Sequence, residues 1–210
     1  LGRGACLADD MGLGKTVQLL ALEAHDRSGG PTGAPTLIVC PMSMVGTWQR
    51  EAATFAPGLR VHAHHGAARP RGEALHARLG EADLVVTTYA TATRDAEDLR
   101  AWRFHRLVLD EAQHVKNHLA KTHQAARRID APFRLAVTGT PFENRLMELW
   151  SLLSIVTPGL YPWPQQFQDQ VVGPVVRQHR ADLQSVDLQP RFGAGCPFRF
   201  FIGTDEEGRG

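Results

Sequence analysis

The stretch LADDMGLGKT, residues 7–16, decides which fold class this sequence predicts. It contains glycines, ends in Gly-Lys-Thr and runs into the apolar segment 17–22, an order that predicts a phosphate-binding loop followed by a helix. Glycine lets the backbone approach an anion closely, and the first N–H groups of a helix have no partner inside the helix. Lys15 would then place its charge on the β- and γ-phosphates of a nucleotide, and the Thr16 hydroxyl would bind Mg²⁺.

Asp9 is the departure in this loop. The common pattern Gly-x4-Gly-Lys-Thr has a glycine at the position that Asp9 occupies here. A glycine turn ahead of an ordinary helix therefore remains an alternative at this point, and the other motifs of the chain have to decide between the two.

Length and composition predict an intracellular globular chain. The 210 residues, 43% of them apolar, suffice for one large domain with a sizeable core. No apolar run reaches 18 residues, and charged residues interrupt the N-terminal segment, so neither a membrane-spanning helix nor a signal peptide is expected. The three widely spaced cysteines favour a reducing compartment. The net charge of +1 carries no global signal for nucleic acid, and frequent Ala, Gly, Pro and Arg are typical of a GC-rich bacterial genome.

Apolar, β-branched runs alternate with helical patterns along the chain. Strands are expected at 36–40, 59–65 (at a sheet edge), 83–89, 106–109 and 133–137, and helices at 16–27, 43–56, 72–79, 95–102, 120–129 and 146–156. In the helix that Ser43 would cap, Trp48, Ala52 and Phe55 would share one face. Such alternation predicts an α/β fold, a mainly parallel sheet with helices on both faces, and ligands at the carboxyl ends of the strands.

Asp110 and Glu111 directly follow one of these apolar strands. Asp110 would hold Mg²⁺ through its water shell, because this ion prefers oxygen ligands and keeps several waters. Glu111 would orient and deprotonate an attacking water. Two solvated acids at a strand end are the alternative, which a phosphate-binding loop in the same chain makes much weaker.

Taken together, these motifs resemble those of the Swi/Snf-type ATPases of helicase superfamily 2. The resemblance covers roughly residues 5–180 and explains Asp9, because this family does not keep the first glycine. It rests on five stretches in order: 7–16 (motif I), 37–41 (Ia), 85–89 (Ib), 110–117 (II), and 138–144 with 149–153 (III). What it implies is the first of two RecA-like lobes, with a P-loop, of an ATP-driven translocase on double-stranded DNA.

The resemblance also implies roles for individual residues. The nucleotide and its Mg²⁺ would be bound by Asp9, Met11, Gly12, Leu13, Gly14, Lys15 and Thr16, with Thr16 and Asp110 serving the metal. The catalytic residues would be Lys15, Asp110, Glu111 and Gln113, of which Gln113 would sense the γ-phosphate. Thr138, Gly139 and Thr140 would couple nucleotide state to closure of the lobes.

A third implied group would contact DNA. It comprises Pro41, Ser43, Thr87, Thr88 and Tyr89. Their contacts would be mostly to phosphates and so would not read sequence. An ordinary strand end is the alternative for residues 87–89. The expected location is the bacterial cytoplasm, in association with the nucleoid.

We expect residues 1–160 to form the ATP-binding lobe, 161–184 a helical extension and 185–210 an atypical tail, disordered or truncated, in which 198–202 could dock locally. The second lobe of the family, with its arginines, is not found in these residues, so we expect a fragment of a longer protein. An arginine finger contributes about 10³–10⁵ in rate, and the chain alone would therefore bind ATP weakly and hydrolyse it slowly. Two rivals remain: a non-catalytic nucleotide-binding fragment, and a lobe of a strand-separating helicase.

Two other patterns are interpreted conservatively. His62, His64 and His65 could be metal ligands, but no carboxylate or cysteine lies nearby in sequence, which favours a solvated strand edge. Trp48 and Trp150 are expected to be packing anchors rather than platforms for stacking bases.

Overall fold

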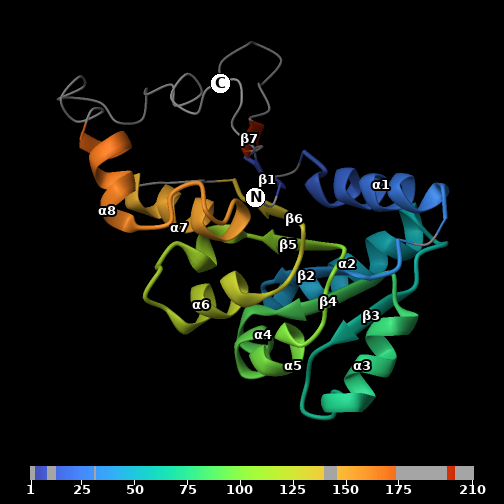
Figure 1. Ribbon diagram of the computed structural model, residues 1–210. Helices are drawn as coiled ribbons and strands as arrows, with labels where there is room; N and C mark the ends of the chain where they lie inside the picture. Colours follow the sequence, from blue (N-terminus) through green and yellow to red (C-terminus); the bar gives the residue numbers. More distant parts are fainter. Residues whose placement is uncertain (1–2, 9–12, 31, 140–145, 174–197, 202–210) are drawn as a thin grey trace.

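A parallel sheet forms the centre of the molecule. The computed structural model describes residues 3–8, 13–30, 32–139, 146–173 and 198–201 (Figure 1). Within them lies a seven-stranded sheet in the order β3-β4-β2-β5-β6-β1-β7, and every neighbouring pair is parallel. The strands are β1 (Arg3–Leu7), β2 (Thr36–Cys40), β3 (Val61–His64), β4 (Leu84–Thr88), β5 (Arg106–Asp110), β6 (Phe133–Val137) and β7 (Phe198–Phe201). The predicted α/β fold with a parallel sheet is confirmed.

Helices cover both faces of this sheet (Figure 1). They are α1 (Lys15–Ser28), α2 (Met42–Phe55), α3 (Gly72–Glu81), α4 (Tyr89–Arg94), α5 (Ala96–Arg100), α6 (Lys121–Arg128), α7 (Leu146–Val156) and α8 (Pro164–Phe167). A 3-10 turn, η1 (Ala112–Val115), follows β5, and a π-helical turn, η2 (Gln168–Val172), follows α8.

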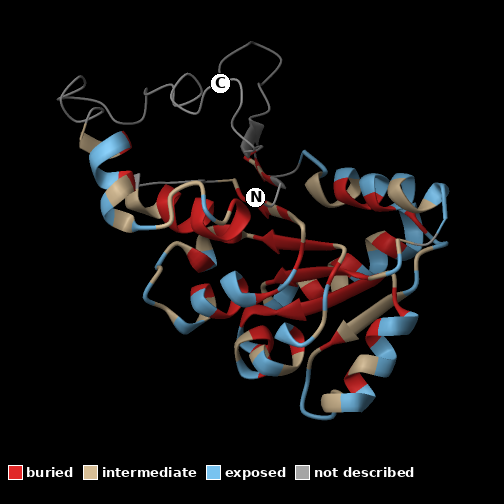
Figure 2. Ribbon diagram, in the orientation of Figure 1, coloured by how far each residue is buried: buried red, intermediate tan, exposed pale blue. Residues whose placement is uncertain are grey.

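The alternation of side chains along the strands divides the core into two clusters. On β2, Ile38 and Cys40 join the cluster under α1 and α2, whereas Leu37 and Val39 join the cluster that contains residues of α3 to α7. Both sets are fully buried, so the central strands are apolar on both sides, as the continuous apolar run predicts. Figure 2 shows these strands as buried, while the helices expose their outer sides.

A buried ionic cluster fixes α1 to the amino ends of the strands. Glu23, only 2% exposed, pairs with Arg27 of its own helix and with Arg106 of β5, and it accepts a hydrogen bond of 2.8 Å from the Thr36 hydroxyl of β2. Arg106 also reaches Asp26 at 2.6 Å. Because the paired groups satisfy one another, α1 is held in one orientation on the sheet.

Gly4 allows α7 to lie against β1. A Cβ atom built on Gly4 would lie 2.1 Å from the carbonyl oxygen of Val156, the last residue of α7. No real Cβ makes such a contact, so only glycine permits this approach. The strand itself was not predicted, because Arg3–Leu7 contains no β-branched or aromatic residue; its position between β6 and β7 makes it a strand.

The start of α2 differs from the prediction. Pro41, and not Ser43, is the N-cap residue, and no side chain caps this helix. Trp48 and Ala52 face the sheet as expected, but Phe55 does not, since its side chain is 58% exposed. The expected shared face was therefore wrong at Phe55, which lies at the last residue of the helix.

The end of β4 also differs. The strand ends at Thr88, and Tyr89 begins a helix, α4, that the sequence did not predict. Thr88 caps this helix by accepting a hydrogen bond of 3.1 Å from the Thr91 N–H. The β-branched run 87–88 and the aromatic Tyr89 favour a strand by pattern alone, and this side-chain cap overrides that preference.

The C-terminal region is described only in parts. The helical turns α8 and η2 lie in the stretch where a helical extension was expected. Within the stretch 185–210, Phe198–Phe201 forms β7 and pairs with Gly4–Leu7 of β1. Residues 174–197 and 202–210 lie outside the described residues.

Among the described residues, no helix is both long enough and apolar enough to cross a membrane.

Candidate functional site

The start of α1 forms the first part of the site. Gly14 is its N-cap in a left-handed conformation (φ 69°, ψ 30°), and no side chain caps the helix. The first N–H groups and the positive end of the helix dipole therefore point out of the helix where Lys15 and Thr16 begin it. The amide of Gln18 donates to the Leu13 carbonyl at 3.1 Å and holds the end of the loop. Asp9, Met11 and Gly12 lie outside the described residues.

Asp110, the last residue of β5, forms the second part. It is 7% exposed, and three bonds fix it. The indole N–H of Trp48 donates to its Oδ2 at 2.9 Å, the backbone N–H of Glu111 donates to its Oδ1 at 3.0 Å, and the Tyr89 hydroxyl donates to its carbonyl at 2.7 Å. The carboxylate thus has a fixed position at the carboxyl edge of the sheet.

Burial shapes the electrostatics of this carboxylate. Burial raises the pKa of Asp110 above its ordinary value, and the neighbouring charge of Glu111 adds to this effect. The hydrogen bond from Trp48 and the positive charge of Lys15 act in the opposite direction. A cation bound here would also favour the charged carboxylate.

Glu111 has an unusual backbone. With φ at 51° it is in the left-handed region, the single non-glycine residue of the described chain with a positive φ. Such a conformation is strained for a residue with a Cβ and is typical of functional sites. This left-handed residue follows the last residue of β5 and is the N-cap of the turn η1.

A chain of hydrogen bonds leads from Glu111 to the neighbouring strand. The amide of Gln113 donates to Glu111 Oε2 at 2.8 Å, and the hydroxyl of Thr138 donates to Gln113 Oε1 at 3.1 Å. Thr138 follows β6, and its own N–H donates to the Leu7 carbonyl at the end of β1. The structure therefore brings Glu111, Gln113 and Thr138 together next to the end of β1. Gly139 follows Thr138, and Thr140 lies outside the described residues.

The residues present fit Mg²⁺. Asp110 supplies carboxylate oxygens and Thr16 a hydroxyl, which are hard ligands, and Mg²⁺ in nucleotide sites takes its remaining ligands from water and phosphates. No group of three or more His, Cys, Asp or Glu side chains gathers as a metal site in the part of the chain that the structure describes. Of the three neighbouring histidines, His64 is buried, and its Nε2 lies within hydrogen-bond distance of Asp95 Oδ2, at 2.9 Å.

The residues expected to contact DNA divide into two sets. Pro41 is partly exposed and Ser43 is exposed, both at the start of α2. Thr87, Thr88 and Tyr89 are buried, and their hydroxyls bond within the chain. The Thr87 hydroxyl donates to the His64 carbonyl at 2.7 Å, and those of Thr88 and Tyr89 bind Thr91 and Asp110 as described above. The three hydroxyls thus have structural roles in this chain.

Sequence reasoning missed the role of Trp48. The prediction that it is a packing anchor is correct as far as it goes, since the ring is 1% exposed. A buried indole N–H, however, requires an acceptor, and an acidic strand end is a natural one. Trp150, the other predicted anchor, is 3% exposed and donates instead to the Tyr161 carbonyl at 3.0 Å.

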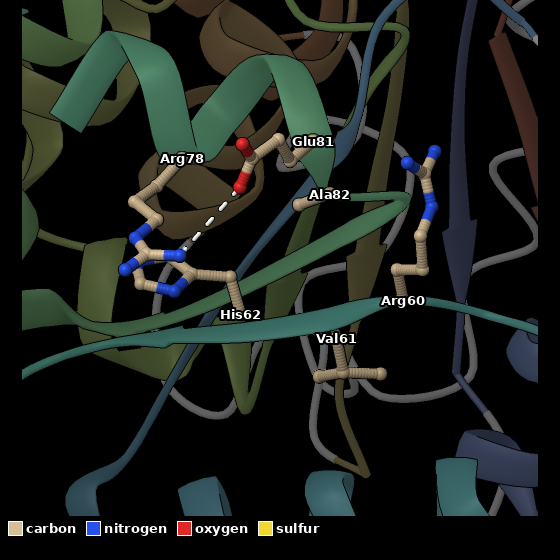
Figure 3. A pocket seen from close by; sticks show the side chains of 6 residues that line it. All are labelled: Arg60, Val61, His62, Arg78, Glu81 and Ala82. Carbon is tan, nitrogen blue, oxygen red and sulfur yellow. Dashed lines mark ion pairs between the residues drawn. The ribbon is translucent and has the colours of Figure 1, made fainter. Parts of the chain in front are cut away.

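A surface pocket lies away from this site (Figure 3). It is at the amino end of β3, whereas the site is at the carboxyl edge, and its two arginines are already paired: Arg60 with Asp83 at 2.9 Å and Arg78 with Glu81 at 3.5 Å. It is lined by Arg60, Val61, His62, Arg78, Glu81 and Ala82.

The sequence of the chain matches a known family. A family model described as the SNF2-related domain covers residues 1–189 of the chain. The chain belongs to the SNF2 family. It is 42% identical over 174 residues to YwqA of Bacillus subtilis, a candidate ATP-dependent helicase/translocase, and this match covers 83% of the chain and 19% of YwqA.

Two other SNF2 relatives extend this finding. The chain is 35% identical over 194 residues to the TATA-binding protein-associated factor MOT1 of Saccharomyces cerevisiae, a match that covers 87% of the chain and 10% of MOT1. The SWI2/SNF2 ATPase core of Sulfolobus solfataricus, solved in complex with dsDNA, superimposes with a TM-score of 0.78 at 31% identity and covers 98% of this chain and 42% of that one. The chain therefore has the RecA-like fold of SNF2 ATPase cores and spans a fifth or less of the two sequence relatives.

Proposed function

We propose that this SNF2-family chain is the ATP-binding lobe of a translocase that moves along double-stranded DNA. The observation that carries the proposal is the hydrogen-bonded chain Glu111–Gln113–Thr138, which starts at a strained residue beside Asp110. It links the Glu111 carboxylate, which would orient the attacking water, to Thr138, the residue after β6. Such a link is what an enzyme needs if loss of the γ-phosphate is to change its conformation.

In this proposal the nucleotide phosphates lie at the start of α1. Lys15 supplies a positive charge to the β- and γ-phosphates, and the N–H groups of the first helical turn donate to phosphate oxygens. Mg²⁺, held through Thr16 and Asp110, would neutralise part of the phosphate charge. Glu111 orients the attacking water and accepts its proton, and Gln113 holds the Glu111 carboxylate in place through its amide.

The DNA part of the proposal is supported by the start of α2. Ser43 is exposed there, at the same carboxyl edge as the nucleotide site, and the solved SNF2 core at 31% identity binds dsDNA. We assign the phosphate contacts to Pro41, Ser43 and the N-terminal turn of α2, whose N–H groups no side chain caps. The proposed lobe comprises residues 1–160, and 161–184 are its helical extension.

Hydrolysis tests the assigned role of Glu111. With the chain in excess over ATP, a single turnover remains measurable even when it is slow. Glu111→Gln should slow this turnover by at least ~10²-fold, because the general base is lost, while ATP affinity stays the same. Unchanged hydrolysis would remove Glu111 from this role. Glu51→Gln, a change of the same chemistry on α2, is the control.

A DNA-binding measurement tests the second part of the proposal, the contact of this chain with duplex DNA. Labelled duplex and single strands of one sequence are titrated with the chain at low salt, and anisotropy is recorded. We expect tighter binding to the duplex and weaker binding for Ser43→Glu, because the new charge repels phosphate while suiting a helix N-terminus. Ala53→Glu adds the same charge to an exposed position in the last turn of α2 and should have little effect. A preference for single strands would favour a strand-separating helicase.

A further inference from the structure

Two aromatic side chains hold Asp110 from opposite faces of the sheet. Trp48 belongs to the core cluster under α1 and α2, and its N–H binds the carboxylate of Asp110 at 2.9 Å. Tyr89 belongs to the other cluster, and its hydroxyl binds the carbonyl of the same residue at 2.7 Å. Both rings are almost completely buried, at 1% and 7% exposure.

This arrangement fixes the direction of the carboxylate. Asp110 Oδ1 accepts the Glu111 N–H, and Oδ2 accepts the Trp48 N–H, so rotation of the carboxylate would break a bond at both oxygens. A Trp or Tyr ring has few rotatable bonds, and close packing on all sides leaves it little freedom. The carboxylate is therefore held by the rigid core rather than by a mobile surface side chain.

The same two residues connect the site to the helices beyond β2 and β4. Trp48 lies on α2, which has Pro41 as its N-cap and Ser43 in its first turn, and Tyr89 is the first residue of α4. Tyr89 also stacks on His114 of η1, with ring centroids 5.1 Å apart and planes at 29°. A shift of either helix would therefore act directly on Asp110 or on the turn that follows it.

We propose that Trp48 and Tyr89 are positioning residues that orient Asp110 for the Mg²⁺ of a bound nucleotide. The inference rests on the proposed nucleotide site. Neither ring touches nucleotide or metal; they act through Asp110. Partners of this kind behind a metal ligand typically contribute 10–100-fold to metal affinity.

The test compares nucleotide affinity with and without the metal. A fluorescent ATP analogue is titrated into the 210-residue chain in Mg²⁺ and in EDTA. For Trp48→Phe the gain in affinity that Mg²⁺ gives should fall roughly tenfold, while affinity in EDTA stays unchanged. Tyr89→Phe should reduce the gain in affinity from Mg²⁺ less than Trp48→Phe does. It removes the hydrogen bond to the backbone carbonyl of Asp110 and leaves the bonds to the carboxylate in place. A merely structural role would change the affinities in Mg²⁺ and in EDTA equally.

Two tryptophans provide matched controls. Trp150→Phe removes an indole hydrogen bond to the Tyr161 carbonyl and not to Asp110, and Trp102→Phe removes a buried N–H for which the described residues offer no acceptor. Neither should change the gain from Mg²⁺. If Trp48→Phe keeps the full gain, the inference is wrong and the nucleotide site stands. If the unaltered chain shows no binding of Mg²⁺ and nucleotide, the proposed function itself fails.

A second readout does not depend on the fold of the variant. In an ¹H–¹⁵N spectrum of the unaltered chain, the indole resonances are assigned by elimination with Trp102→Phe, Trp150→Phe and Trp163→Phe. Addition of Mg²⁺ to the nucleotide-bound chain should shift the Trp48 indole resonance and leave those of Trp102 and Trp150 in place. A Trp48 resonance that does not respond would overturn the proposal.

Discussion

Glu111, the residue after β5, has a backbone conformation that is unusual for a residue with a side chain. Its positive φ is a cost to stability, since a Cβ in the left-handed region is unfavourable by about 1–2 kcal/mol. In the part of the chain that the structure describes, the Glu111 carboxylate accepts a hydrogen bond from Gln113. A strained backbone at a residue with a bonded carboxylate agrees with the catalytic role that we propose for Glu111.

Replacement of Glu111 by glycine and by alanine separates the two effects. Both changes remove the carboxylate, but only glycine relieves the strain. We expect Glu111→Gly to be more stable than Glu111→Ala by about 1 kcal/mol, measured as the free energy of unfolding in urea. Equal stability of the two variants would show that the turn is not strained in solution.

The residue scale also shows what sequence could and could not provide. Asp110, Glu111, Gln113 and Thr138 were predicted from motifs, and the structure brings them together. The Trp48 bond was not predicted, because an indole N–H and a carboxylate that lie 62 residues apart meet only through the pairing of β2 with β5. The order of the strands in the sheet would have been needed to predict this hydrogen bond.

At the scale of the elements, the packing of α7 on β1 depends on one glycine. Gly4→Ala would place a Cβ 2.1 Å from the Val156 carbonyl, so the helix or the strand would have to shift. We expect a loss of about 1–3 kcal/mol in the free energy of unfolding, measured by denaturant titration.

Gly58→Ala is the control for this prediction. A Cβ at Gly58 meets no atom within 4 Å, and the residue is exposed. Its effect should stay within about 0.5 kcal/mol. If Gly4→Ala were as harmless as Gly58→Ala, the close approach of α7 to β1 would not exist in solution.

The elements that sequence predicted are those with a strong internal pattern. Three of them begin and end in the structure at the residues that the sequence predicts, because apolar runs and clear breakers define them: β2, β6 and α7. β1 and α4 were missed for opposite reasons. β1 has a weak strand pattern and is a strand through its neighbours, whereas α4 starts inside a strand-like run and is a helix through its cap.

At the scale of the whole molecule, buried histidines make stability depend on pH. Burial lowers the pKa of His62, His64 and His123 below the ordinary value of about 6.5. The unfolded chain then binds more protons than the folded one, so this contribution is complete above pH ~6.5 and is lost as the pH falls toward the folded pKa values. Burial raises the pKa of Asp110, so its contribution to stability changes with pH in the opposite direction to that of the histidines.

We therefore expect the free energy of unfolding to fall when the pH is lowered from 7.5 to 5.5. The fall is up to about 1.4 kcal/mol per pH unit for each histidine. Urea titrations at several pH values measure it. His123→Gln should make the fall less steep, because the ring that bonds Ser151 and Ser154 can then no longer be protonated. A free energy that rises on acidification in this range would contradict the assignment.

The central claim is that the carboxyl edge of this SNF2 sheet binds ATP with Mg²⁺. It is tested most directly by titration of the 210-residue chain with a fluorescent ATP analogue, beside Lys15→Ala. Alanine suits the first turn of α1, so the fold should stay intact, and Lys121→Ala, an exposed lysine at the start of α6, is the control. We predict saturable, Mg²⁺-dependent binding that Lys15→Ala weakens by roughly 10–100-fold and Lys121→Ala leaves unchanged. Equal binding by all three chains would contradict the claim.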